Sequence, residues 1–506
     1  MAKAPTQVTS RSTKVNVSYE RRELRDRKAD YQKVVDCVAG QSVIKKKGDK
    51  YLPRPNASDE SDENQARYDA YKERAVFYNV TGRTLSGLVG EVFARDPVEE
   101  LPPGLDVVSE DADGAGLTLT QLAKKGCRHT LSLGRAGLLA DYPQTEGGVT
   151  RAEVAEVRPT LTMYDALSII NWRTHKVGNE TQLTLVVLVE MYDKEDDGFE
   201  TKQEKQYRVL RLVDGVYTVQ LYRDGSPYGE TLVPTDHTGD TFEYIPFTFI
   251  GSENNDSEVD HAPLLDLAEI NIGHYHNSAD YEESAFITGQ PTLTLAGLTE
   301  EWVNNVLKGE VRIGSRGAIP LPEGGKAAMF QAAANTMPFE AMEHKERQMV
   351  ALGAKLVEQK QVQRTATEAG IEHNTETSTL SNVAKNVSAA IKFGLEVCAR
   401  FVGLSDSVEI VYELNTDFTL ARMAAQERQQ LIAEWQQGAI TFSEMRAAMR
   451  KSGVATLDDE EAREEIKDEV DMMGHNGGPG LDDEDDEGGT GDEDDEDDPN
   501  AGTGDE

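Results

Sequence analysis

The sequence predicts an α+β protein that is mostly helical, and three observations support this expectation. Apolar residues return at helical spacing in several stretches before residue 139 and after residue 263. Between Arg158 and Ile250 the segments are short, rich in Val, Tyr, Thr and Leu, and separated in places by Asp-Gly turns. From Asp458 onward the chain holds 24 acidic and two basic residues, so we expect residues 457–506 to form a disordered acidic tail.

Three helices are expected before the β region. The first is a charged segment from Ser18 to Cys37. An apolar stripe from Tyr71 to Phe93 predicts the second, broken near Gly82 and stopped by Pro97. Leu117–Leu139 is the third candidate.

A long helix should follow the β region, with Pro263 in its first turn and its end at about Phe286. Residues 287–337 are mixed. The stretches QPTLTLAGL and GEVRIGSRGAIPLP are strand-like, and TEEWVNNVL predicts a short helix capped by Thr299. LPEGGKAAM lacks the spacing of a phosphate-binding loop, and a hairpin turn is the better interpretation.

The next segment predicts a helix from Phe339 to about Lys360, followed by a polar loop over 361–377. A continuous helix from Phe339 to Phe401 is the alternative, because the segment contains few helix breakers. Apolar residues from Leu380 to Phe401 mark one face of a long amphipathic helix. A strand, SVEIVYEL, and two helices over 420–437 and 442–451 complete the pattern, with Thr441 or Ser443 as the cap of the last helix.

The formal net charge of −39 is uneven, because the tail from Asp458 supplies 22 of these charges and the remaining chain 17. A body of this sign should not grip DNA phosphates tightly, although it can surround DNA. The acidic tail is a solubilising segment, a DNA mimic or a calcium site, and it lacks EF-hand spacing. The polar residues 1–16 predict a disordered lead without a secretion signal, and no apolar run is long enough for a membrane helix.

Motifs for catalysis or metal binding are not found. The sequence has no GxxxxGK[ST], HExxH or GxSxG pattern. His274 and His276 are two residues apart on a helix and should not share a metal. Cys37, Cys127 and Cys398 lie far apart and are expected to be buried thiols in a reducing compartment. We therefore expect no enzymatic activity and no cofactor.

Three stretches in order resemble a family of tailed-bacteriophage portal proteins that has long been catalogued as a domain of unknown function. They are LSLGRAGLLADYP (Leu131–Pro143), RPTLTMYDALSIINWR (Arg158–Arg173), and the segment Tyr244–Gly297. The resemblance extends more loosely from about Tyr19 to Gly453. It implies a portal fold in a ring of about twelve identical subunits, located at one capsid vertex of a virion and assembled in the cytoplasm of a bacterial host. Double-stranded DNA would pass through the ring without sequence recognition, during both packaging and ejection.

The resemblance also implies a division of the chain: a wing (17–261), a stem helix (262–286), an α/β clip (287–337), a second stem helix (338–360), a channel loop (361–377), and a wing helix with crown (378–456). Expected partners are the terminase large subunit, the major capsid or scaffold protein, and the head-tail connector. DNA-facing positions would be Lys360, Val362, Arg364, Thr365, Thr367 and Ile371. Motor-facing positions in the clip would be Trp302, Lys308, Arg312 and Arg316, although Trp302 is equally a candidate core residue.

A different class of function remains open. An acidic helical scaffold or chaperone, which binds partners and forms no channel, would share the composition and many of the helices. The β region, and the strand–helix–strand unit between two long helices, favour the portal interpretation over a plain scaffold.

Overall fold

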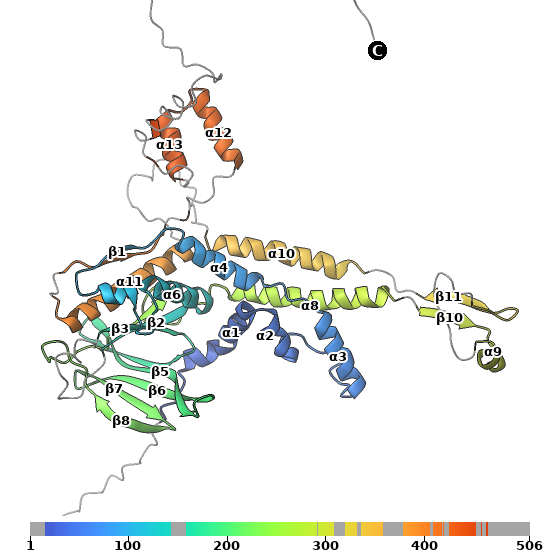
Figure 1. Cartoon of the computed structure of the whole chain (residues 1–506), viewed down its shortest axis with the longest axis horizontal. Coiled ribbons are helices and arrows are strands. Elements are labelled where there is room, and N and C mark those ends of the chain that lie inside the picture. Colours follow the sequence, from blue (N-terminus) through green and yellow to red (C-terminus); the bar gives the residue numbers. More distant parts are fainter. Residues whose placement is uncertain are drawn as a thin grey trace, which may run out of the picture. The chain divides into compact units, whose positions relative to one another are not determined.

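The computed structural model describes residues 16–142, 158–290, 292–307, 319–330, 335–357, 378–404, 408–416, 418, 425–451, 457 and 462–463 (Figure 1). The chain divides into two units, Met1–Phe418 and Thr419–Glu506, and each is described by itself. The expected mixture of helices and strands is confirmed, with the strands arranged in four small sheets within the described residues. The predicted disordered lead and acidic tail lie almost wholly outside the described residues.

The N-terminal part is helical, with elements α1 (Arg22–Ala39), α2 (Gln41–Lys46), the 3-10 turn η1 (Gly48–Lys50), α3 (Asp62–Arg74) and α4 (Val80–Val92). The helical stripe that was expected to break near Gly82 in fact breaks earlier. Asn79 is the N-cap of α4, and its side-chain oxygen accepts a hydrogen bond from the Gly82 N–H at 2.8 Å. Gly82 therefore lies in the first turn of α4, because a capping residue satisfies one of the free N–H groups that begin a helix.

The third predicted helix is shorter than expected. Short elements β1 (Val98–Glu100) and α5 (Asp106–Glu110) lead to α6 (Leu119–Leu133), which begins with a capping box between Thr118 and Gln121. The helix ends at Gly134, whose φ of 71° is left-handed, and a Cβ atom there would lie 2.5 Å from the carbonyl oxygen of His261. The next residues form strand β2 (Arg135–Asp141), so the prediction of helix through Leu139 was wrong.

The β region is antiparallel, as predicted. A three-stranded sheet has the order β3-β2-β9, and a five-stranded sheet has the order β4-β5-β6-β7-β8. The strand bounds are β3 Thr160–Asp165, β4 Ile169–Val177, β5 Glu180–Asp196, β6 Thr201–Val213, β7 Val216–Arg223, β8 Ser226–Leu232 and β9 Phe247–Gly251. Strands β5 and β6 are longer than their neighbours, and their shared end forms a hairpin without further strand partners among the described residues.

Two long helices flank a small mixed unit. These elements are α8 (Leu265–Thr288), β10 (Thr292–Ala296), α9 (Glu300–Asn305), β11 (Lys326–Phe330) and α10 (Met337–Lys355). Pro263 lies just before the N-cap Leu264 rather than inside the first turn of α8. The partner of β10 is β11, which was not predicted. The predicted strand GEVRIGSRGAIPLP falls largely outside the described residues, and its end, 319–322, is not a strand. The expected turn is present, because Gly324 has a φ of 82°.

Helix α11 (Thr379–Val402) supplies the central apolar stripe of the larger unit. The predicted face is confirmed, because all its members are buried: Leu380, Val383, Val387, Ile391, Leu395, Cys398 and Phe401. This helix packs against α6, β2 and β9, and strand β12 (Val411–Glu413) pairs with β1. Burial of a side chain such as Leu or Val contributes roughly 1.5–3 kcal/mol, so this stripe is a main source of stability. All three cysteines are buried free thiols, as expected.

The second unit contains α12 (Ala425–Gln436) and α13 (Phe442–Lys451) among its described residues. Thr441 caps α13, because its hydroxyl accepts from the Glu444 N–H at 3.2 Å. The Glu444 carboxylate accepts in return from the Thr441 N–H at 2.8 Å. This result decides between the two predicted caps in favour of Thr441.

Candidate functional site

Helix α8 is held on several sides by the N-terminal helices. On α1, Lys33 forms an ion pair with Glu269 at 2.8 Å, and the Cys37 thiol lies 3.9 Å from the carbonyl oxygen of Ala268. On α3, the hydroxyl of Tyr71 donates to Asp280 at 2.7 Å. Burial and this contact with a carboxylate raise the pKa of Tyr71. A further ion pair joins Arg74 to Glu283.

Buried polar groups fix α8 against α4 and against the segments beside it. Asn271 is fully buried and accepts from both the backbone N–H and the hydroxyl of Thr81. The amide of Asn271 donates to the carbonyl oxygen of Tyr78 at 2.8 Å. His276 donates to the carbonyl oxygen of Tyr51 at 2.6 Å. A buried polar group must find such partners, so α8 has one defined position relative to α4.

Helix α8, the expected first stem helix, carries five carboxylates, and three of them have partners within the chain, namely Glu269, Asp280 and Glu283. Asp266 and Glu282 have no ion pair among the described residues. The acidic charge of the chain was expected to limit its grip on DNA phosphates. On α8, the contacts show that most of this charge holds the helix to α1 and α3.

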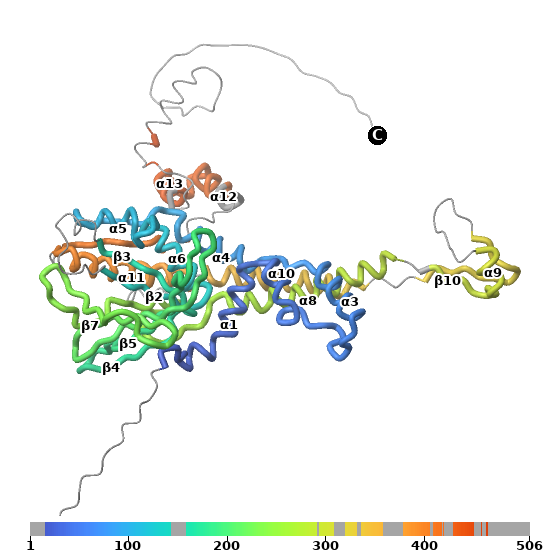
Figure 2. The backbone as a smooth tube through the Cα atoms, turned by 60° about the horizontal axis from the view of Figure 1, so that its bottom comes forward, coloured from blue at the N-terminus to red at the C-terminus, as the bar shows by residue number. Residues whose placement is uncertain are grey.

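Helix α10 has much less cover than α8. It runs beside α8, as both Figure 1 and Figure 2 show, and Met349 is its single buried residue. Lys345 donates to Asn277 at 3.3 Å, and the Nε2 atom of His274 lies 3.2 Å from Glu346. His274 and His276 thus have different partners, Glu346 on α10 and the carbonyl oxygen of Tyr51 after η1.

Apolar side chains are exposed where α8 ends and α10 begins. Met337 is 74% exposed, and Phe286 and Phe339 are also exposed. A groove of about 530 Å³ lies between the two helix ends and is lined by Tyr281, Ser284, Ala285, Thr288, Gly289, Asn335, Thr336 and Phe339. Val350, farther along α10, is 71% exposed. A single soluble chain rarely leaves such a series of large apolar side chains in water without a binding role.

The unit between the helices presents a partly exposed tryptophan. Thr299 caps α9 as predicted, because its hydroxyl accepts from the Trp302 N–H at 3.3 Å. The indole N–H of Trp302 donates to the carbonyl oxygen of Pro320 at 3.2 Å. Trp302 is half-buried and is therefore neither a full core residue nor a free surface residue. Met329 and Phe330 on β11 are more exposed, and sequence reasoning missed them.

Most predicted site residues lie outside the described residues. These are Lys308, Arg312 and Arg316 of the expected clip, and Lys360, Val362, Arg364, Thr365, Thr367 and Ile371 of the expected channel loop. In the sequence, 308–318 lies between α9 and β11, and 358–377 lies between α10 and α11.

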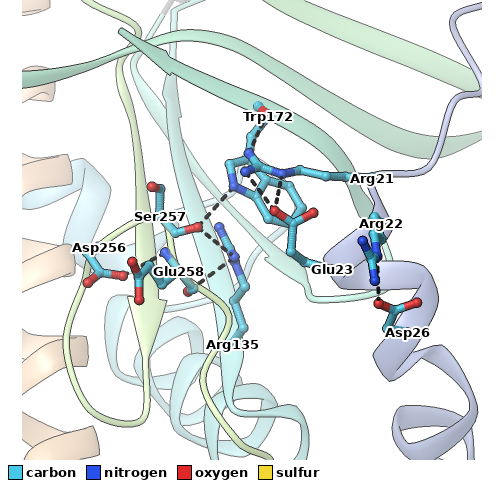
Figure 3. Close-up of polar contacts among 9 residues, drawn as sticks. All are labelled: Arg21, Arg22, Glu23, Asp26, Arg135, Trp172, Asp256, Ser257 and Glu258. Carbon is cyan, nitrogen blue, oxygen red and sulfur yellow. Dashed lines mark hydrogen bonds and ion pairs between the residues drawn. The ribbon is translucent and has the colours of Figure 1, made fainter. Parts of the chain in front are cut away.

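A buried cation–aromatic stack fixes the start of the α8 segment, and sequence reasoning did not predict it (Figure 3). The Arg135 guanidinium lies 4.1 Å from the Trp172 ring and 3.7 Å from the Phe249 ring. It also donates to the carbonyl oxygens of Ser257 and Glu258, in the loop that leads to α8. Burial lowers the pKa of Arg135 to about 9.

The other face of the Trp172 ring is covered by Arg21, whose guanidinium lies 4.6 Å away. Arg21 donates to the carbonyl oxygen of Trp172 at 2.8 Å, and the Trp172 indole N–H donates to that of Ser257 at 3.0 Å (Figure 3). The stack therefore joins the beginning of α1, strand β4, strand β2 and the 252–261 loop. The sequence signal for it was a single arginine, Arg135, immediately before the apolar run 136–140.

Among the described residues, no group of three or more His, Cys, Asp and Glu side chains is arranged to hold a metal ion. Within the same part of the chain, no helix is long and apolar enough to cross a membrane.

Comparisons with known proteins give the following matches. A family described as a domain of unknown function (DUF4055) matches residues 263–402, from the start of the α8 segment to the end of α11. No curated protein matches. Among solved structures, the chain is similar to a chain of the virion of a native gene transfer agent (GTA) particle, with 18% identity and a TM-score of 0.39. The match covers 83% of this chain and 100% of that chain.

Two neck structures are similar at the same level. One is the neck of a native GTA particle computed with C12 symmetry, with 15% identity and a TM-score of 0.36, covering 73% of this chain and 88% of that chain. The other is the neck of an empty GTA particle computed with C6 symmetry, with 16% identity and a TM-score of 0.37, covering 83% of this chain and 100% of that chain.

Proposed function

We propose that the protein is a phage portal protein: a subunit of a ring that forms the DNA channel at one capsid vertex. The observation that carries the proposal is the pair α8 and α10. Helix α8 is held within its own chain, whereas α10 is covered on one side and leaves Phe339 and Val350 in water. In a ring, a neighbouring subunit covers this face.

The order of elements supports the same assignment. A helix, a small α/β unit, a second helix, a connection and a long buried helix follow one another along the chain, which is the order of stem, clip, stem, channel loop and wing helix. The matched family spans these elements. The 24 residues of α8 extend roughly 36 Å at about 1.5 Å per residue, a suitable length for crossing a shell opening.

The proposed ring acts without catalysis and without a cofactor. DNA passes through it during packaging and ejection, the terminase motor docks on the unit between the stem helices, and head-tail connector proteins later replace the motor. The channel must hold DNA loosely, because each phosphate neutralised by Lys or Arg strengthens binding and slows passage. The net negative charge of the chain is consistent with loose contact.

Negative-stain microscopy and sedimentation of the purified full chain test the proposal. We expect end-on rings with a central hole. The variant Val350→Glu places a charge on the exposed face of α10 and should prevent ring formation while leaving the folded subunit intact. Val177→Glu is the matched control, because Val177 is exposed on β4, away from α10, and this variant should still form rings.

The competing function, an acidic scaffold or chaperone, predicts a different result. Elongated monomers or dimers over a wide range of concentration and salt, both alone and when co-expressed with the capsid protein, would exclude the ring and favour the scaffold. Co-expression is included because a capsid surface can be needed to close a ring.

A further inference from the structure

The end of the β5–β6 hairpin is an arm that its own chain does not cover. Among the described residues, the strand pairing of Asp193–Glu204 stays within the β5–β6 hairpin, because β7 pairs with β6 no farther than Gln206, and β4 pairs with β5 no farther than Leu188. We call the segment Asp193–Glu204 the arm. A two-stranded hairpin without a third strand or a packed face is marginally stable in water, so a surface that receives it would stabilise it.

The tip of the arm carries a phenylalanine in full contact with water. Phe199 is 103% exposed, the highest value among the exposed large apolar residues. Its orientation is set locally, because the Asp197 carboxylate accepts from the backbone N–H groups of Phe199 and Glu200 at 2.9 and 2.6 Å. The same hydrogen bonds, Glu200 first, lower the pKa of Asp197. A fully exposed aromatic ring on an ordered turn is typical of a residue that enters a partner.

The arm is also strongly acidic around this ring. It contains six acidic residues and two lysines. The lysines are already used, since Lys194 pairs with Glu204 at 2.8 Å and Lys202 lies 3.8 Å from Glu195. The carboxylates closest to Phe199 in the sequence, Asp197 and Glu200, have no ion pair among the described residues. The surface that fits this arm is therefore apolar at its centre and positively charged at its edge.

A surface with these properties lies on the same chain, between α3 and α4. Val76 is 48% and Tyr78 is 43% exposed, and the Arg83 guanidinium lies 5.5 Å from the Tyr78 ring. Helix α2 adds Lys45 and Lys46 beside this segment. We call Lys45, Lys46, Val76, Tyr78 and Arg83 the receiving patch.

Two hydrogen bonds hold the parts of the receiving patch together. Lys45 donates to the carbonyl oxygen of Glu73 at 2.7 Å, and the Phe77 N–H donates to the side chain of Gln41 at 3.0 Å. The Glu73 side chain is the nearby acid on this segment and is exposed. Lys46 and Arg83 have no ion pair among the described residues, so they remain available to carboxylates of a partner.

We propose that the arm of one subunit docks on the receiving patch of a second copy of the chain, with Phe199 against Val76 and Tyr78. The inference rests on the proposed ring and names one contact between its subunits. Phe199 is fully exposed in the single chain, so it does not contact its own patch. A closed ring of identical subunits needs two different complementary surfaces on each copy, and the arm and the receiving patch form such a pair.

Cysteine cross-linking tests the contact directly. The double variant Phe199→Cys with Tyr78→Cys should form a disulfide between chains under mild oxidation, giving a ladder of covalent oligomers. The three natural cysteines are buried and should not react in the folded protein. Phe199→Cys with Val177→Cys is the matched control, because Val177 is more exposed than Tyr78 but lies outside the patch. Equal cross-linking in the test and control variants, or none in either, overturns the proposal.

Charge reversal supplies a second measurement. Glu200→Lys should weaken self-association, and Lys46→Glu should restore it when the two changes are combined, because neither side chain has an ion pair among the described residues. Phe199→Ser should weaken association by roughly tenfold or more, the loss typical of a buried aromatic anchor. An unchanged association constant in Phe199→Ser contradicts the inference, as does a combined variant weaker than either single charge reversal.

These outcomes separate the inference from the proposed function. If Phe199→Ser forms rings normally and the Phe199→Cys, Tyr78→Cys variant gives no interchain disulfide, the portal function stands but the proposed contact is wrong. If the wild-type chain forms no rings and the double cysteine variant forms no cross-links, both the portal function and the proposed contact are wrong. Phe199→Ser rings that assemble normally but fail to enter capsids would assign the arm to another virion protein, and the proposal as stated would be wrong.

Discussion

The side-chain oxygen of Asn271 on α8 accepts two hydrogen bonds from Thr81 on α4, one from the backbone N–H at 3.1 Å and one from the hydroxyl at 2.9 Å. Both residues are fully buried. Because the same amide also donates to the carbonyl oxygen of Tyr78, one side chain makes polar contacts with both α4 and the segment that precedes it.

Asn271→Ala should lower the free energy of unfolding by about 2–4 kcal/mol, because it leaves the buried backbone N–H and hydroxyl of Thr81 without this acceptor. Asn277→Ala is the control, since Asn277 is partly exposed and accepts only from Lys345, and its cost should stay below about 1 kcal/mol. Urea unfolding followed by tryptophan fluorescence measures both. Equal losses would show that the buried position of Asn271 is unimportant.

A buried carboxylate connects α1 to the turn after α2. Asp36 accepts from the Tyr51 hydroxyl at 2.6 Å, from Lys50 at 3.1 Å and from Gln32 at 2.8 Å. Burial acts to raise the pKa of Asp36, but the three hydrogen bonds outweigh burial and hold the pKa below its ordinary value of 3.8. Such a group stabilises the folded chain when ionised.

The pKa of Asp36 is lower in the folded state than in the unfolded state, so its stabilising contribution is complete above pH 3.8 and is lost as the pH falls through the folded pKa. Asp36→Asn should therefore be less stable than wild type at neutral pH, and the difference should shrink below that value. Glu110→Gln, at an exposed position, is the control and should show no such trend. Urea unfolding at several pH values gives the result, and a difference independent of pH would refute the assignment.

The Arg135 stack predicts an unusual order of stability among variants at this position. Arg135→Lys should cost about 2–4 kcal/mol, because lysine keeps a buried charge but lacks the planar guanidinium that contacts both the Trp172 and Phe249 rings. Arg135→Met should cost less, since it keeps an apolar filling and removes the charge. The carbonyl oxygen of Glu258 then loses its donor, while that of Ser257 keeps the Trp172 indole N–H. Thermal unfolding measures the order, and Lys being tolerated better than Met would show that the charge is the important property.

Local signals in the sequence predicted local structure well. The caps Thr299 and Thr441 and the apolar face of α11 are confirmed, because each depends on residues within a few positions of one another. The boundaries at Asn79 and Gly134 were missed. In both cases apolar spacing continues across the boundary, and a single capping residue or a left-handed glycine ends the helix.

Features that depend on distant partners were not predictable in the same way. The segment Lys326–Phe330 contains two alanines and a methionine, residues that favour helices, and it is a strand because it pairs with Thr292–Ala296. The exposure of Phe199 depends on where β4 and β7 stop, which no local pattern reveals. The Arg135 stack joins four segments far apart in the sequence, so only the folded chain brings its members together.

The connection between α10 and α11 is predicted to touch DNA in the channel. Deleting Val362–Asn374 and replacing it with a Gly-Ser bridge should leave rings intact, because the segment contains only two large apolar residues, Val362 and Ile371. DNA packaging or retention should fail. Nuclease protection of packaged DNA measures the effect, and normal packaging with normal retention would show that the segment has no essential contact with DNA.

The unit between α8 and α10 is predicted to face the terminase motor and later the connector. Its charge is balanced, with Glu300, Glu301, Glu310 and Glu323 against Lys308, Arg312, Arg316 and Lys326, whereas the remaining chain is acidic. Reversing Arg312 and Arg316 to Glu should weaken motor docking while rings still form, because the change alters the charge of this surface without touching α8. Reversing Arg173 and Lys176 to Glu on β4 is the matched control for added negative charge, because both are exposed and lie outside the arm and the receiving patch. This control should leave docking to the terminase large subunit unchanged. Pull-down of that subunit on preformed rings, together with packaging efficiency, provides the measurement.

Trp302→Phe, which keeps the apolar ring but loses the hydrogen bond to Pro320, should reduce docking less than the double reversal. If the double reversal binds and packages like wild type, the motor docks elsewhere on the ring.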